Sequence, residues 1–294
     1  MDYFDAHVHT NYSDGDYSVD EVIKMAVDKG GIKHLAITDH NKLLPNLNEL
    51  RKKNPNLELI SGSEISAEYY TSNRERKEIH IVGLFLTHTN ELISFLANNT
   101  PDIKIRFEAM LEKLNECGVN LGYKTFEGFR SHYYPERENL GRPQLAAIIA
   151  KKGYATSVEQ AMDFFIGDYG DRLAYVPNPH TFADMASVIN IIHKAGGVAI
   201  LAHPFSYDLS YDEVIALVRH FKAEKGDAIE VFYSRYNREK RQILARIADR
   251  KNLLYSCASD FHGNRDTDRL DNHFPVEYLD KLREKHNEYA KKYL

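Results

Sequence analysis

The 294-residue sequence contains no tryptophan and only two cysteines, Cys117 and Cys257. These cysteines lie far apart and form no CxxC pair, which excludes a disulfide framework or a zinc ribbon and favours a reducing compartment with two buried, inert thiols. No uncharged apolar run reaches the roughly 18 residues of a membrane-spanning helix, and the start MDYFDAHVHT lacks the basic and apolar regions of a signal peptide. We therefore expect a cytoplasmic protein that does not enter a membrane.

A large excess of charge of one sign is also missing, because the formal net charge is only −5. The sequence thus gives no global basic field of the kind that binds duplex nucleic acid by electrostatics. A small anionic substrate is still allowed, since bound cations can reverse the charge of a pocket. With 43% hydrophobic and 28% charged residues, the chain can bury a core the size of one barrel domain or of two smaller domains.

Short apolar or β-branched runs recur along the chain and alternate with segments whose apolar residues lie three and four apart. This alternation is typical of repeated β-α units around a parallel sheet. Residues 19–30 and 211–226 have helical spacing and end in glycine, so we expect crossover helices there. The seven predicted strands are Tyr3 to Val8, His34 to Thr38, Leu57 to Ser61, Ile79 to Phe85, Val198 to Leu201, Ala228 to Phe232 and Leu253 to Ala258.

Between the fourth and fifth predicted strands, residues 101–176 have helical periodicity but no clear buried strand. We therefore expect a barrel formed by residues 1–100 and 177–294, with residues 101–176 as a small helical insertion. The insertion is either a lid over a substrate site or an inert addition, and periodicity does not separate these alternatives. The mixed-charge run at residues 72–78 is interpreted as a solvated loop without a nucleic-acid role, and the C-terminus as a solvated helix.

Side chains of the types that bind metals fall at most of the predicted strand ends. His7 and His9 lie two residues apart, so an extended chain points both to one face. The carboxyl ends of parallel strands converge on the face where active sites are built. His80 lies early in its run, so either the predicted boundary or the regularity of that strand is wrong. The candidate metal ligands are His7, His9, Asp14, His40, Glu64, His80, His203, Asp260 and His262.

Imidazole and carboxylate ligands without thiolates suit zinc, manganese or iron. The candidates outnumber the three or four ligands that one catalytic ion needs, which indicates two or three divalent ions. Neighbouring cations lower the pKa of a shared water and neutralise phosphate oxygens as the transition state forms. Phosphoester hydrolysis needs both effects, so it is the reaction that the pattern favours.

Six segments, HVHTNYSDG, ITDH, the glutamate of SGSE, IHIVG, LAHPF and SDFHG, resemble in sequence and order the motifs of the polymerase-and-histidinol-phosphatase (PHP) superfamily. The resemblance implies an α/β fold, a distorted seven-stranded β/α (TIM-like) barrel. It implies an attacking hydroxide held between ions, with Glu64, His203 and Asp260 as catalytic residues, and leaves Asp39 to orient a ligand or cap a strand end. The implied ion sites are His7, His9, Glu64 and Asp260 for one ion, Glu64, His80 and His203 for a second, and Asp14, His40 and His262 for a third.

The middle of the chain is similar to stand-alone PHP phosphoesterases that act on nucleotides or on the 5′ ends of short RNA. This similarity implies a small phosphorylated substrate, with Arg142 and Gln144 as substrate-binding residues. Arg142 matches the phosphate-contacting arginine, and a guanidinium can hold phosphate oxygens in bidentate fashion. Gln144 stands where histidine is usual, and Asn41 stands after the TDH motif where aspartate is common.

Other interpretations stay open for some of these residues. Asp14 in SDG is also a good turn residue, and Arg142 before Pro143 could form a surface ion pair. An amidohydrolase would use similar ligands, but it usually needs a strand-end lysine or a different histidine spacing. A non-catalytic PHP module would be expected to have lost ligands, whereas all nine positions hold metal-capable side chains. We therefore predict a metal-dependent phosphoesterase.

Overall fold

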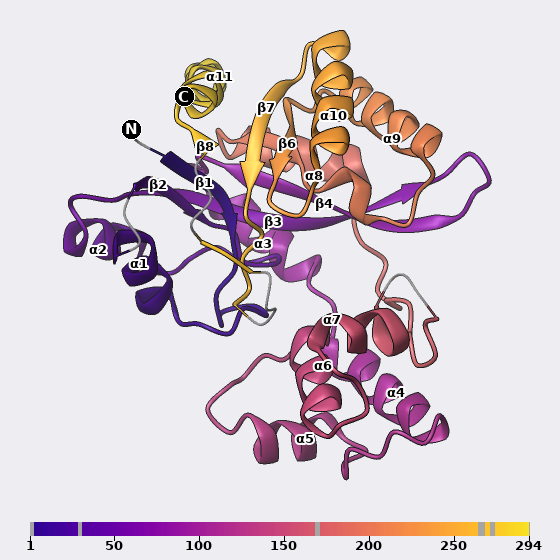
Figure 1. Ribbon diagram of the computed structural model, residues 1–294. Coiled ribbons are helices and arrows are strands. Elements are labelled where there is room, and N and C mark those ends of the chain that lie inside the picture. The colour runs from indigo at the N-terminus through magenta and orange to yellow at the C-terminus, as the bar shows by residue number, and fades with distance from the viewer. Residues whose placement is uncertain (1–2, 29–30, 168–170, 264–267, 271–273, 294) are drawn as a thin grey trace.

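The structure is a computed structural model that describes residues 3–28, 31–167, 171–263, 268–270 and 274–293. Its strands form one sheet in the order β7-β6-β5-β4-β3-β2-β1-β8 (Figure 1). The strands are β1 (Tyr3–Val8), β2 (Ile32–Ile37), β3 (Glu58–Tyr70), β4 (Arg76–Leu84), β5 (Val198–Leu201), β6 (Ala228–Tyr233), β7 (Leu254–Ala258) and β8 (Phe274–Pro275).

The sheet curls so that the end of β1 meets the segment that follows β7. The His9 N–H donates to the Phe261 carbonyl at 2.9 Å, and the Asp260 N–H donates to the His7 carbonyl at 2.9 Å. These bonds join the ends of β1 and β7 into a nearly closed barrel, which confirms the predicted fold class. The predicted count of seven strands is one short, because β8 has only two residues and too little sequence signal to be recognised.

Strand β4 is the main departure from a uniformly parallel barrel. It pairs antiparallel with β3 and with β5, placing His80 opposite Ser66 and Ile81 opposite Leu201. The start of an antiparallel strand lies at the same end of the barrel as the ends of its parallel neighbours. His80 is the middle residue of β4 and pairs with Ser66 in the second half of β3, so it reaches the same mouth as the other candidate ligands.

Strand β3 continues far beyond the predicted Ser61, as far as Tyr70. Its second half carries Glu64, Ser66 and Glu68, which alternate with apolar residues and are stabilised by a β-hairpin with β4. Long-range pairing of this kind outweighs local strand propensity. The predicted solvated loop at residues 72–78 is correspondingly too long, because residues 76–78 belong to β4.

Helices cover the outside of the barrel, and both predicted crossover helices are present as α1 and α9. A capping box in which Ser210 and Glu213 satisfy each other's backbone N–H groups starts α9. Among the described residues, no helix is long and apolar enough to cross a membrane. The helices around the barrel are α1 (Val19–Asp28), α2 (Leu47–Lys53), α3 (Asn90–Asn98), α8 (Met185–Lys194), α9 (Tyr211–Ala223), α10 (Arg238–Lys251) and α11 (Glu277–Tyr293), with a 3-10 turn at Pro204–Ser206.

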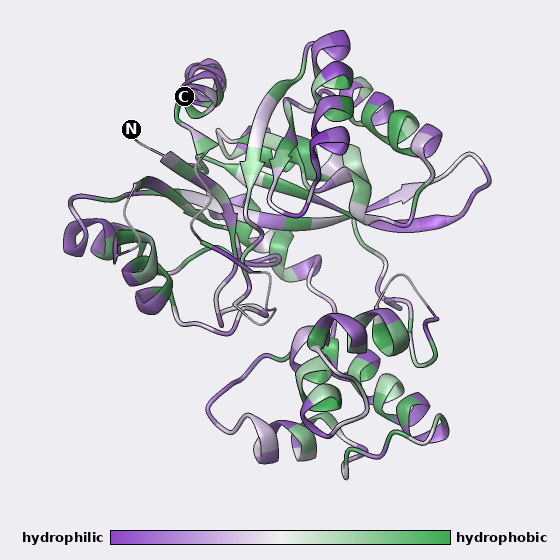
Figure 2. Cartoon of the chain, viewed as in Figure 1, coloured by the Kyte–Doolittle hydropathy of each residue, from purple (hydrophilic) through white to green (hydrophobic). Residues whose placement is uncertain are grey.

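A separate group of helices hangs below the barrel in Figure 1. It comprises α4 (Ile103–Glu116), α5 (Phe126–Tyr133), α6 (Arg142–Lys151), α7 (Val158–Ala161) and a π-helical turn at Met162–Ile166. Its apolar faces turn inward (Figure 2) and form a core of its own, which includes Phe107, Phe126 and Phe129. Cys117, at the end of α4, is exposed, so the expectation that both thiols are buried is wrong for this residue; Cys257 is buried.

Because the helical group has its own core, a cavity in that core should loosen it without loosening the barrel. Replacement of the fully buried Phe129 by alanine should lower the free energy of unfolding by about 3–5 kcal/mol. Hydrogen exchange should accelerate in α4 to α6 while the barrel strands keep their protection. The matched change Phe221→Ala, in the barrel core, should accelerate hydrogen exchange in the barrel and leave the exchange of α4 to α6 unchanged. If exchange accelerates equally in both parts in both variants, the two cores are not independent.

Candidate metal centre

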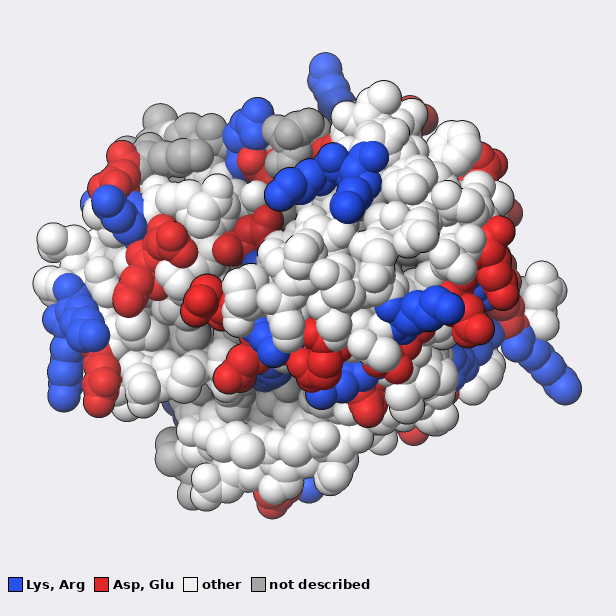
Figure 3. Space-filling model, turned by 90° about the horizontal axis from the view of Figure 1, so that it is seen from below, with Lys and Arg blue, Asp and Glu red and all other residues white. Residues whose placement is uncertain are grey.

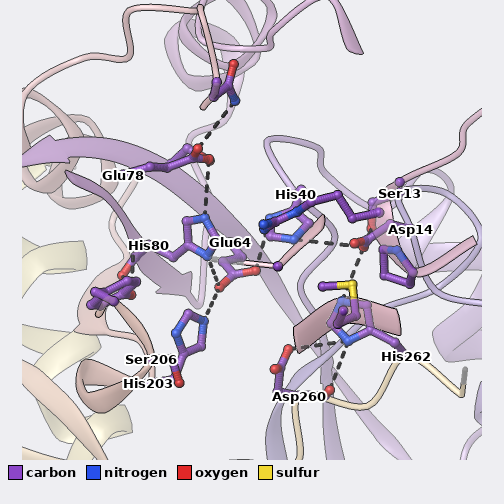
Figure 4. Close-up of a pocket in the computed structure, with 18 of the residues that line it drawn as sticks. Ser13, Asp14, His40, Glu64, Glu78, His80, His203, Ser206, Asp260 and His262 are labelled. Carbon is purple, nitrogen blue, oxygen red and sulfur yellow. Dashed lines mark hydrogen bonds and ion pairs between the residues drawn. The ribbon is translucent and has the colours of Figure 1, made fainter. Parts of the chain in front are cut away.

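One mouth of the barrel gathers all nine predicted ligand side chains. Figure 4 shows those that line the pocket, namely Asp14, His40, Glu64, His80, His203, Asp260 and His262. They fall into overlapping groups in which one potential ligand atom from each residue lies within 4.8 Å of the others. The groups share members, so the side chains form one continuous cluster. The groups are His9, Asp14, His40 and His262; His7, Glu64 and His203; His7, His9 and Asp260; and His40, Glu64 and His80.

The carboxylate of Glu64 lies at the centre of this cluster and is only 1% exposed. Its Oε1 atom lies 3.0 Å from His80 Nδ1 and 2.9 Å from His203 Nε2. The two imidazoles, one within β4 and one just after β5, approach the same oxygen, as Figure 4 shows. This half of the carboxylate matches the implied second ion site.

The other oxygen of Glu64 faces a different set of nitrogens. Oε2 lies 3.3 Å from His7 Nε2, 3.1 Å from His9 Nε2 and 3.1 Å from His40 Nδ1. Despite these short distances it forms no hydrogen bond of acceptable geometry. His7 Nδ1 lies 2.7 Å from the carboxylate of Glu230, which can only accept a hydrogen bond, so Nδ1 carries the proton. The lone pair of neutral His7 is then on the Nε2 atom that faces Glu64. Lone pairs that converge on a carboxylate oxygen repel one another unless a cation lies among them, so these residues fit divalent metal ions.

Asp14 brings a further carboxylate to the cluster from the loop after β1. Its Oδ1 atom lies 3.3 Å from His262 Nε2, 3.7 Å from His9 Nδ1 and 3.8 Å from His40 Nε2. Only glycine fits at position 15, because a Cβ atom there would lie 2.8 Å from the backbone of His9. The tight loop thus places Asp14 over the barrel mouth as well as forming a turn.

Asp39 holds this loop in place and does not reach the centre of the cluster. Its carboxylate accepts hydrogen bonds from the Thr10 N–H at 2.9 Å, the Thr10 hydroxyl at 2.7 Å and the Ser13 hydroxyl at 2.5 Å. The Ser13 hydroxyl in turn lies 3.4 Å from His9 Nδ1. Asp39 therefore acts on the ligands through the loop that carries them.

Asp260 closes the cluster from the end of β7. Its Oδ1 atom lies 3.4 Å from His9 Nε2 and 3.5 Å from His262 Nδ1. Its Oδ2 atom accepts a hydrogen bond from the Tyr233 hydroxyl at 2.7 Å and lies 3.2 Å from Arg235. Asp260 has a φ of 51°, an uncommon value for a residue with a side chain, which is typical of functional sites.

Three residues that position ligands were missed from the sequence: Glu230, Tyr233 and Arg235. Glu230 is buried in the apolar strand AIEVFY of β6, and its carboxylate contacts both His7 and the backbone of His203. A single acidic residue in an otherwise apolar strand was the available signal. Nothing in the local sequence distinguished Tyr233 or Arg235.

Gln144, which the sequence predicts to bind substrate, makes hydrogen bonds to the chain itself. Its side-chain oxygen accepts from the Gly141 N–H at 2.7 Å, and its Nε2 donates to the Asp14 carbonyl at 2.8 Å and to Asp16 Oδ1 at 3.0 Å. Gln144 is 1% exposed and is not among the described residues that line the pocket. These contacts join α6 to the loop that bears Asp14.

Asn41, at the position after the TDH motif, forms hydrogen bonds that hold two segments of the site together. Its φ of 49° turns the chain sharply after His40. Its side-chain oxygen accepts from the Ser66 N–H at 3.1 Å, and its backbone N–H donates to the Glu64 carbonyl at 2.8 Å. Asn41 therefore connects the segment of His40 to strand β3, which carries Glu64.

The charges within the cluster are strongly coupled. Burial lowers the pKa of His9, but the nearby carboxylates of Asp260 and Glu64 outweigh it and raise the pKa to about 10. Burial also lowers the pKa of His80, but the carboxylates of Glu64 and Glu78 outweigh it and raise the pKa to about 10. For His40, burial dominates and lowers the pKa to about 4. Burial raises the pKa of Glu64, but the surrounding imidazoles hold it well below its usual value.

A pocket of about 980 Å³ opens from the cluster and runs between the barrel and helices α4, α6 and α7. Arg142, at the start of α6, lines it, as do Arg106 and Phe107 of α4. Figure 3 shows acidic and basic side chains lying next to one another on the face seen from below. The cationic side chains that line the pocket are Lys42, Arg76, Lys77, Arg106, Arg142, Arg172, Arg235 and Lys240.

A barrel with this ligand cluster defines a class of protein: the chain belongs to the PHP-domain family, whose model matches residues 5–294. It is 32% identical over 263 residues to the 5′-3′ exoribonuclease Rnm of Escherichia coli (strain K12), covering 88% of this chain and 85% of that protein. It is 26% identical over 281 residues to a 3′,5′-nucleoside bisphosphate phosphatase of Chromobacterium violaceum, covering 92% and 93%. The family resemblance of the motifs is thus confirmed.

A solved structure from Chromobacterium violaceum, described as an amidohydrolase with bound sulfate and no metal, has the same fold. Its TM-score is 0.74, its sequence identity is 24%, and the match covers 96% of each chain. At this identity the likeness concerns the fold alone.

Protons and metal ions should compete for the cluster, since metal binding requires deprotonated imidazoles. In chelator-treated protein, His9 and His80 contribute stability that is complete below about pH 6.5 and is lost as the pH rises through about 10, because their pKa values are raised. Glu64 has a lowered pKa, so its contribution is present above about pH 4.5 and is lost as the pH falls. The increase in Tm on adding Mn²⁺ should therefore grow from about pH 6 to about pH 9, as measured by thermal unfolding. An increase that shrinks over this range would contradict the proton–metal competition.

Proposed function

We propose that this PHP-family enzyme hydrolyses the phosphate ester of a nucleotide or of the 5′ end of a short oligonucleotide. The chain is a metal-dependent phosphoesterase, the class to which the named relatives belong. The observation that carries the proposal is the carboxylate of Glu64, whose two oxygens face two different sets of imidazole nitrogens. A ligand that bridges two ions needs this arrangement, and phosphoester hydrolysis is the reaction that benefits most from adjacent cations.

The nine side chains would hold two or three divalent ions, with Mn²⁺, Zn²⁺ or Fe²⁺ suited to the imidazole and carboxylate donors. Glu64 would be shared between the ion of His7, His9 and Asp260 and the ion of His80 and His203. Bound there, the ions would polarise the phosphate oxygens and lower the pKa of a water molecule. His40 faces both Glu64 and Asp14, so it would belong to the site of Asp14 and His262 or connect it to Glu64.

The residues of the chain would fix the substrate around this centre. Arg142 lies on the pocket wall formed by the helical group and would bind a phosphate through its guanidinium. Residues from α4 and α6 line the same pocket, so the segment 101–176 would act as a lid that excludes water. The pocket volume of about 980 Å³ suits a nucleotide-sized ligand better than inorganic phosphate alone.

Purified protein loaded with Mn²⁺, Zn²⁺ or Fe²⁺ should release phosphate or mononucleotide from at least one of three substrate types. These are nucleoside bisphosphates, nucleoside monophosphates and short RNA with a 5′ phosphate. An amide substrate serves as the comparison, because a related barrel can support C–N hydrolysis. Turnover of the amide together with no turnover of any phosphate ester would overturn the proposal.

Replacement of Glu64 by alanine removes the shared ligand, so the variant should lose at least one equivalent of metal and nearly all turnover. Elemental analysis of the desalted protein and a steady-state assay measure the two effects. Glu58→Ala is the matched control, since Glu58 lies on the same strand but pairs with Arg283 and His34 outside the cluster. If Glu64→Ala keeps the metal content and activity of the Glu58→Ala control, the ligand assignment is mistaken.

Replacement of Arg142 by alanine should raise KM for a phosphorylated substrate by about 10- to 100-fold, because a charge-assisted hydrogen bond contributes about 1.5–3 kcal/mol. The metal content should not change. Arg130→Ala is the control, because Arg130 pairs with Glu127 on α5 and is not among the described residues that line the pocket. An unchanged KM in Arg142→Ala would remove Arg142 from the substrate site.

A further inference from the structure

We propose that Glu230 is a positioning residue that sets the orientation of two metal ligands, His7 and His203, which face different oxygens of Glu64. The proposal rests on the function proposed above, because it requires that the cluster bind metal. Glu230 belongs to none of the candidate ligand groups among the described residues, and it does not line the pocket. It lies in the middle of β6 and is 1% exposed.

The first carboxylate oxygen of Glu230 determines which nitrogen of the His7 ring carries the proton. Glu230 Oε1 lies 2.7 Å from His7 Nδ1, and both side chains are buried. A carboxylate only accepts hydrogen bonds, so Nδ1 must carry the proton. The lone pair of neutral His7 is then on Nε2, which lies 3.3 Å from Glu64 Oε2 and 3.7 Å from Asp260 Oδ1. Glu230 therefore selects the tautomer that can bind an ion at the centre of the cluster.

The second oxygen of Glu230 controls the backbone of His203. Glu230 Oε2 accepts a hydrogen bond from the His203 N–H at 2.7 Å. His203 has a φ of 27°, in a region that residues with a side chain rarely adopt, so this conformation needs support from its surroundings. The bend directs His203 Nε2 to within 2.9 Å of Glu64 Oε1. One buried carboxylate thus fixes a ligand on each side of Glu64.

A carboxamide of the same shape cannot replace this carboxylate. Both contacts of Glu230 require an acceptor, whereas glutamine offers one acceptor oxygen and one donor NH₂ group. In Glu230→Gln, an NH₂ group facing His7 would force the proton onto Nε2 and block ligation there. An NH₂ group facing His203 would oppose the backbone N–H and destabilise the bend. Either orientation impairs one ligand.

The structure supplies a matched control in Asp227, which lies just before the same strand. Asp227 Oδ2 lies 2.8 Å from His193 Nε2 and accepts a hydrogen bond from the Ala199 N–H at 2.9 Å. It is a buried carboxylate that, like Glu230, contacts one imidazole and one backbone N–H, and its Oδ1 also accepts a hydrogen bond from the Tyr289 hydroxyl at 2.7 Å. Neither Asp227 nor His193 belongs to a candidate ligand group or lines the pocket. Asp227→Asn should therefore affect stability but not metal binding.

The test compares wild type, Glu230→Gln and Asp227→Asn as full-length proteins with Mn²⁺ as the probe. Metal equivalents are measured by elemental analysis, affinity by competition with a chelator, and Tm with and without Mn²⁺. Glu230→Gln should bind Mn²⁺ about 10- to 100-fold more weakly, the usual effect of losing a group that orients a ligand. Its gain in Tm on adding Mn²⁺ should shrink, whereas Asp227→Asn should lower both Tm values and keep the gain.

A second measurement on the wild-type protein does not depend on a variant that folds. In Zn²⁺-loaded protein with ¹⁵N-labelled histidine, the His7 imidazole should be protonated at Nδ1, as seen by NMR with assignment from His7→Asn. Protonation at Nε2, or wild-type metal affinity in Glu230→Gln, would overturn the positioning role. Equal loss of metal in Glu230→Gln and Asp227→Asn would overturn it too, since the effect would then be a general loss of stability. Absence of metal binding by the wild type would instead defeat the proposed function.

Discussion

The burial of a carboxylate among imidazole nitrogens is the constraint on which the rest of the structure depends. Glu64 is almost fully buried, and a buried charge is costly unless it is paired and hydrogen-bonded. Five nitrogen atoms lie within 3.3 Å of its two oxygens, contributed by His7, His9, His40, His80 and His203. Protons on some of the imidazoles would balance part of the buried negative charge. Metal ions shared among the side chains would bind both oxygens and all five nitrogens together. The site therefore suits metal ions, and a bound cation would contribute to the stability of the mouth as well as to catalysis.

The fold meets this constraint by bringing chain segments together from three directions. His7 and Asp260 come from the ends of parallel strands, His80 from the middle of the antiparallel β4, and Asp14 from the loop that contains Gly15. Unusual backbone conformations at His203 and Asp260 turn their side chains inward. Around them, Asp39, Glu230, Tyr233 and Gln144 use their hydrogen bonds on the ligands or on the loops that carry them.

Much of the barrel could be predicted from the sequence, because β1, β5 and β7 are short apolar runs followed directly by metal-type residues. The direction of β4 could not, since apolar alternation is the same in a parallel and an antiparallel strand. The second half of β3 was not predicted, because its glutamates and serines have low strand propensity and are held in the strand by pairing with β4. The contacts of Gln144 with the Asp14 loop could not be predicted, because the groups involved are brought near one another only by folding. The same holds for Glu230, whose partners lie more than twenty residues away.

The most direct measurement of the central claim is a crystal structure of Mn²⁺-loaded protein with anomalous diffraction data. The account predicts at least two anomalous peaks, one on each side of the Glu64 carboxylate, with His80 and His203 contacting one ion and His7 contacting the other. A single ion bound away from Glu64, or an ordered cluster that takes up no ion at saturating Mn²⁺, would contradict it.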